Sequence, residues 1–161
     1  MPTTHARIDE SLVAHLLRRA SFGGTTEELS HFSEIEYETA VDELLNARDT
    51  MSIPQDIIRR YHVDMSDLRT RPASSGNWLY HMVNTDAPLV EKVNLFWHRI
   101  FATGQTKLIQ GKAMTTQLDM FREFGLGKFD ELLLQLSKNP AMIMWLDNQD
   151  NHKGSINENY G

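Results

Sequence analysis

The chain has 161 residues and a net charge of −6, with 16 lysines and arginines against 22 aspartates and glutamates, and it contains no cysteine. This length suits about one domain, and the composition excludes collagen-like repeats, low-complexity disorder and a disulfide scaffold. The lack of cysteine excludes thiolate zinc sites and iron–sulfur clusters, and no apolar run approaches the roughly 18 residues that a transmembrane helix requires.

Hydrophobic periodicity predicts one helix after another along the chain. In the first helix, Leu12, Leu16 and Leu17 are expected to face inward. Thr25 and Glu28 have the spacing of a capping box, which predicts the start of the second helix. The predicted helices cover residues 9–20, 26–32, 36–46, 54–62, 78–83, 88–102, 112–124, 129–137 and 140–146.

Charge is concentrated in residues 27–49, which hold eight acids and one base. This segment therefore carries −7, and the remainder of the chain sums to +1; a solvated helix face is the simplest interpretation. Because no basic face is visible, nucleic-acid binding is not expected. Arg18 and Arg19 precede residues 21–24 and could bind an anion at the next helix start. Alternatively, they pair with acids or cap the preceding helix.

Residues 71–76 read Arg-Pro-Ala-Ser-Ser-Gly and are predicted to form a polar connection. No stretch of five residues alternates clearly between apolar and polar, so strands are not expected. The predicted fold class is therefore all-α, as an orthogonal array of several helices. Residues 1–161 are expected to form a single region of this kind.

The predicted helix at residues 88–102 carries the first candidate site. Glu91, Asn94 and His98 share one side of this helix, and Arg99 follows His98. They could act as a metal ligand set or an acid–base pair, or His98 could be a core histidine that is hydrogen-bonded across helices. The opposite side of the helix is apolar and carries Leu89, Val93, Phe96 and Ile100.

A second candidate site follows the last predicted helix. The spacing from Asp147 onward matches the oxygen-ligand positions of a calcium loop, which predicts calcium as a cofactor. Position 6 of that loop is His152, where the sharp turn favours glycine. An Asn/Asp-rich turn that bonds its own backbone is the alternative. The candidate side-chain ligands are Asp147, Gln149, Asn151, Ser155 and Glu158.

Several segments in a consistent order resemble the bacterial domain of unknown function 1800 family. They are residues 14–23 (AHLLRRASFG), 91–103 (EKVNLFWHRIFAT), 139–142 (NPAM), 146–148 (LDN) and 157–160 (NENY). The resemblance implies a predominantly helical protein considerably longer than this chain. Residues 1–161 are then expected to be the N-terminal part of a larger helical domain.

The resemblance implies no established reaction. Members of that family are often encoded beside a domain of unknown function 1501 protein, which suggests that protein as a partner. Many members look exported, but no signal peptide is visible in this chain. Two functions stay open: a metal or polar site near His98 and residues 147–158, or a non-catalytic module that acts with the domain of unknown function 1501 partner.

Overall fold

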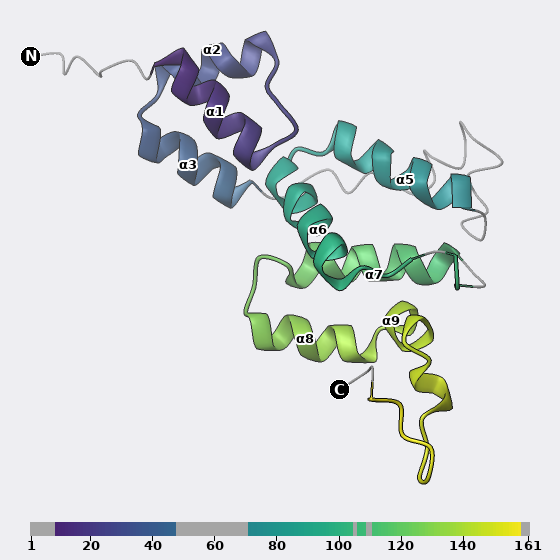
Figure 1. Cartoon of the computed structure of the whole chain (residues 1–161). Coiled ribbons are helices and arrows are strands. Elements are labelled where there is room, and N and C mark those ends of the chain that lie inside the picture. The colour runs from purple at the N-terminus through teal and green to yellow at the C-terminus, as the bar shows by residue number, and fades with distance from the viewer. Residues whose placement is uncertain (1–8, 48–70, 105, 109–110, 159–161) are drawn as a thin grey trace, which may run out of the picture.

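The computed structural model describes residues 9–47, 71–104, 106–108 and 111–158 (Figure 1). The all-α prediction is confirmed, because these residues form helices and no strand beyond one isolated bridge between His152 and Ser155. The elements are α1 (Glu10–Ala20), α2 (Thr26–Glu34), α3 (Tyr37–Asn46), α5 (Arg71–Asn84), α6 (Pro88–Phe101), α7 (Gly111–Phe124), α8 (Phe129–Lys138), α9 (Pro140–Trp145) and a 3-10 turn, η2 (Asn148–Asp150).

Side chains at the helix starts explain several of these boundaries. The predicted capping box is present: the Glu28 amide donates to Thr25 Oγ1 at 3.2 Å, and the Thr25 amide donates to Glu28 Oε2 at 2.7 Å. Asp9 caps α1 and Asn139 caps α9, each accepting a backbone N–H at 3.0 Å. A proline then opens both α6 and α9, where its missing N–H costs nothing.

The prediction of a polar connection at residues 71–76 is wrong, because α5 already begins at Arg71. Ser74 and Asn77 are both buried, so packing of this polar segment against its neighbours outweighs the weak helix propensity of serine and glycine. The helix predicted at residues 54–62 lies outside the described residues.

The helices form two packed groups joined by α6 (Figure 1). In the first group, α1, α2 and α3 enclose a core that includes Val13, Leu17 and Phe32. Val13 is fully buried whereas Leu12 is 42% exposed, so the prediction that Leu12 faces inward is wrong. In the second group, α7 contacts α5, α6, α8 and α9 and so forms the centre of the array.

Helix α6 is buried most completely on its polar side. Glu91 and Asn94 are 2% and 0% exposed, whereas Phe96 and Ile100 on the apolar side are 53% and 55% exposed. Leu89, also on the apolar side, is half-buried against the core of the first group, so the apolar side is exposed only in part. The polar side of α6 therefore faces α5 and α7, and its contacts define the candidate site.

Candidate functional site

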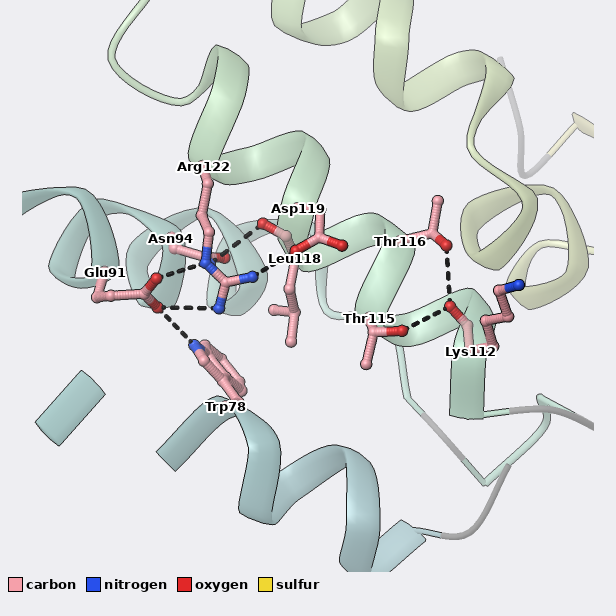
Figure 2. Close-up of polar contacts among 9 residues, drawn as sticks. All are labelled: Trp78, Glu91, Asn94, Lys112, Thr115, Thr116, Leu118, Asp119 and Arg122. Atoms are coloured by element: carbon pink, nitrogen blue, oxygen red, sulfur yellow. Dashed lines mark hydrogen bonds and ion pairs between the residues drawn. The ribbon is translucent and has the colours of Figure 1, made fainter. Parts of the chain in front are cut away.

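Glu91 joins three helices through an ion pair and a hydrogen bond (Figure 2). Its carboxylate accepts two hydrogen bonds from Arg122 of α7, one from Nε and one from Nη2 at 3.3 Å. It also accepts a hydrogen bond from Trp78 Nε1 of α5 at 3.0 Å. Arg122 also donates to Asp119 at 2.6 Å. Because the buried charge of Glu91 has a cationic partner and an additional donor, this network is a satisfied structural connection between α5, α6 and α7.

One helical turn away, the buried polar groups are not satisfied. The Asn94 amide nitrogen donates to the Leu118 carbonyl oxygen at 3.2 Å, which fixes the amide orientation and leaves Oδ1 directed elsewhere. Within the described part of the chain, Asn94 Oδ1, His98 Nδ1 and both polar atoms of Gln117 are buried without a hydrogen-bond partner. We call Asn94, His98 and Gln117 the α6–α7 polar cluster.

The members of the polar cluster come from α6 and α7, two helices that contact each other. Asn94 and His98 are one turn apart on α6, and Gln117 directly precedes Leu118, whose carbonyl oxygen Asn94 binds. Asn94 and Gln117 are both 0% exposed. Buried polar groups normally have partners in the protein or in ordered water, so the four unpartnered atoms on these two helices make α6 and α7 the place to look for a site.

His98 is held in place by an aromatic contact. Its imidazole meets the Trp78 indole edge to face, with 5.1 Å between ring centroids. Burial lowers the pKa of His98 below its ordinary value of 6.5, since the charged imidazolium loses hydration. At neutral pH the ring is therefore uncharged and can offer Nδ1 as a donor or an acceptor, depending on its tautomer.

The four predicted site residues on α6 therefore lie in different environments. Asn94 and His98 contribute unpartnered atoms, Glu91 belongs to the ion-pair network, and Arg99 is exposed. Sequence reasoning missed Trp78, Arg122 and Gln117, which come from α5 and α7. The one local signal for Gln117 is that a glutamine occurs among apolar residues of α7 such as Met114 and Leu118.

Comparison with known proteins identifies the family. The family model described as a protein of unknown function (DUF1800) matches residues 15–161. The chain belongs to the DUF1800 family. No curated protein and no solved structure gives a significant match. Membership confirms the resemblance expected from the sequence segments and places the polar cluster within the part of this DUF1800 chain that the family model covers.

The loop predicted to bind calcium in this DUF1800 chain forms a compact turn. Asp147 is ion-paired with Lys107, and Asn151 Oδ1 accepts the Asn157 amide at 3.3 Å. Positive φ angles occur at Asp147 (56°) and Gly154 (95°), and neither is position 6 of the loop, where a calcium loop turns sharply. Among the described residues, no three His, Asp or Glu side chains are grouped closely enough to hold a metal. Calcium binding here stays a prediction from spacing.

Arg18 and Arg19, the predicted anion-binding pair, are both exposed in the last turn of α1. The start of α2 beside them is already occupied by the Glu28 carboxylate of the capping box. The end of α1 is capped instead by Lys92 of α6, whose Nζ donates to the Arg18 and Ser21 carbonyl oxygens at 3.1 and 2.8 Å. Anion binding by this pair stays a prediction.

A helix that crosses a membrane must be both long and apolar. None of the helices in the described ranges combines the length and the apolar character needed to cross a bilayer. This finding agrees with the sequence, which offers no sufficiently long apolar run.

Proposed function

We propose that this DUF1800 chain binds a small polar ligand through the α6–α7 polar cluster of Asn94, His98 and Gln117. The single observation that supports this function is the set of four buried atoms without partners on the contacting helices α6 and α7. An unpartnered buried donor or acceptor costs about 1–3 kcal/mol, so retaining several on two neighbouring helices favours a role beyond packing.

The surrounding residues suit such a role because they are already fixed. Trp78 donates its indole N–H to Glu91 while its ring contacts His98, so one side chain connects the ion pair to the cluster. Arg122 and Glu91 satisfy each other, whereas the cluster atoms have no hydrogen-bond partner among the described residues. A rigid outer layer of this kind holds ligand-contacting groups in position.

Nuclear magnetic resonance titration tests the proposal directly. The ¹⁵N-labelled 161-residue chain would be titrated with acetamide, acetate and methylammonium, while the side-chain signals of Asn94, His98 and Gln117 are followed. At least one probe is expected to shift the cluster signals saturably, and Gln117→Met should abolish the shift. Gln135→Met, a half-buried site on α8, is the matched control. If no probe moves the cluster signals, the proposed function is wrong.

A second candidate function is protein interaction, and it is favoured by an exposed aromatic surface. Phe96 on α6 contacts Trp97 at 4.9 Å between ring centroids, and Trp97 stacks on Phe129 of α8 at 5.7 Å. Phe96 and Phe129 are each more than half exposed, so the rings form a continuous apolar surface across two helices. The domain of unknown function 1501 protein implied by the sequence resemblance is the partner to test.

Calorimetric titration of the chain with that partner separates this candidate from the first. Phe96→Ser and Phe129→Ser should each weaken binding about tenfold or more if the aromatic surface is the contact. Leu12→Ser, which changes an exposed apolar residue of α1, should leave the affinity unchanged. Absence of binding, or equal losses in all three variants, would reject the aromatic surface as the docking face.

A further inference from the structure

The exposed aromatic surface belongs to a larger apolar face that crosses α6 and α8. We call Phe96, Ile100, Leu126, Phe129 and Leu133 the α6–α8 apolar face. Each of these side chains is between 39% and 55% exposed. Trp97 links them, because its ring contacts Phe96 and Phe129 and its indole N–H donates to the carbonyl oxygen of Gly125, beside Leu126, at 2.8 Å. We infer that two copies of this chain pair through the α6–α8 apolar face in a symmetric dimer.

The size of the face suits such a dimer. A large apolar side chain such as phenylalanine presents about 150–250 Å², so five of them at roughly half exposure present on the order of 500 Å². A standard protein interface buries about 800 Å² on each partner, of which about 56–65% is apolar. The α6–α8 apolar face therefore supplies the apolar share that one side of a stable interface needs.

Opposite charges flank the face on its two helices. Successive residues of a helix are about 100° apart, so Arg99 lies about 160° from Trp97, on the outer side of α6 beyond Phe96. By the same geometry, Asp130 lies about 160° from Leu132, which is only 1% exposed, and so on the outer side of α8. Arg99 and Asp130 are both exposed. The face therefore has a base at its α6 edge and an acid at its α8 edge.

A two-fold axis matches these two charges to each other. In a symmetric dimer the same surface serves on both copies, so α6 of one copy lies on α8 of the second. With the axis near the contact between Trp97 and Phe129, Arg99 of each copy faces Asp130 of the other. A surface that complements its own charges favours a second copy of the chain over an unrelated partner.

The distribution of net charge also permits two copies to approach at this face. The chain carries −6, and such a charge makes identical molecules repel each other. Residues 27–49 carry −7, however, and most of their acids lie on α2 and α3. These two helices lie at the other end of the molecule from α8 (Figure 1). The remainder of the chain, which includes the α6–α8 apolar face, sums to +1, so repulsion is weak where the copies meet.

Sedimentation equilibrium of the 161-residue chain tests for the dimer. A dimer that forms with a dissociation constant in the micromolar range or below is expected, as is typical of an interface of this size. Phe96→Ser and Phe129→Ser should each raise that dissociation constant about tenfold or more. Leu12→Ser, at an exposed apolar residue of α1, should leave it unchanged.

Exchanging the flanking charges tests how the two copies are arranged. Arg99→Asp and Asp130→Arg should each raise the dissociation constant about tenfold or more, because like charges then face each other twice in every dimer. Mixing the two variants should restore the dimer, since each mixed pair regains both opposite charges. Glu38→Arg, at an exposed acid of α3, should not weaken the dimer. A folding defect in either variant cannot produce the recovery on mixing.

Three outcomes would overturn this inference: a chain that stays monomeric at concentrations up to about 200 μM, a dimer that survives both phenylalanine substitutions, or charge variants that stay monomeric when mixed. A monomeric chain that binds the domain of unknown function 1501 protein, and loses that binding on Phe96→Ser, would assign the face to that partner instead. None of these results bears on the α6–α7 polar cluster, whose titration uses separate signals.

Discussion

Replacing Gln117 with methionine should stabilise the protein. Gln117 is fully buried on α7, and neither of its polar side-chain atoms has a hydrogen-bond partner among the described residues. Methionine has nearly the same length and flexibility and carries no strong donor or acceptor. The substitution therefore removes the cost of two unpartnered polar atoms while keeping the helix contact filled.

The expected magnitude follows from those two atoms. Each unpartnered buried donor or acceptor costs about 1–3 kcal/mol, while a volume-conserving substitution in a core usually costs less than about 1.5 kcal/mol. The net gain in the free energy of unfolding should therefore be on the order of 1–3 kcal/mol. For a chain of this size, each kcal/mol raises the melting temperature by about 2–4 °C, so the expected rise is roughly 2–12 °C.

Differential scanning calorimetry of the two proteins measures this change. Gln135→Met on α8 is the control, because a half-buried glutamine outside the polar cluster should change the melting temperature by less than about 2 °C. The same Gln117→Met protein is expected to lose the response to the small probes, so stability would increase as binding is lost. A fall in melting temperature on Gln117→Met would refute the reasoning, since it would mean that the amide makes favourable hydrogen bonds.

The ion pair, the imidazole and the C-terminal loop give three more predictions. Glu91→Gln should lower the free energy of unfolding by on the order of 3 kcal/mol in urea titrations, because Arg122 then loses its buried charged partner and keeps only the exposed carboxylate of Asp119. Glu131→Gln, at an exposed pair, should cost less than about 0.5 kcal/mol, and equal losses would contradict the distinction. Stability should fall as pH drops below 6.5, because burial lowers the folded-state pKa of His98 and the unfolded chain binds the proton first. This fall in stability should be smaller in His98→Gln. An unchanged pH profile in that variant would mean that a group other than His98 causes the fall. If residues 147–158 bind calcium, calcium should raise the melting temperature in a way that Asp147→Asn abolishes; identical curves with calcium and with chelator would exclude it.

Local sequence patterns predicted the helices well because their causes are local. Thr25 and Glu28 lie three residues apart, and their capping box is present as expected. Prolines 88 and 140 likewise open α6 and α9. The start of α5 could not be predicted in this way, since burial of Ser74 by other parts of the chain overrides a weak local propensity.

The candidate site was only half predictable, for a similar reason. Periodicity placed Glu91, Asn94 and His98 on one side of a helix and indicated that this side faces protein, but it could not identify the partner that makes burial of Glu91 possible. That outcome depends on Arg122, which lies 31 residues away in the chain and neutralises Glu91. Spacing along one helix reveals which residues share a face, whereas their partners depend on tertiary packing.

The central claim is that side chains from α6 and α7 form a single ligand site. Its most direct test is the titration of the unaltered chain with the three small probes, with the His98 ring nitrogens and the Gln117 side-chain amide followed in the same samples. One site predicts that both signals shift together and give the same dissociation constant. Signals that stay fixed, or that saturate at clearly different concentrations of one probe, would contradict the claim.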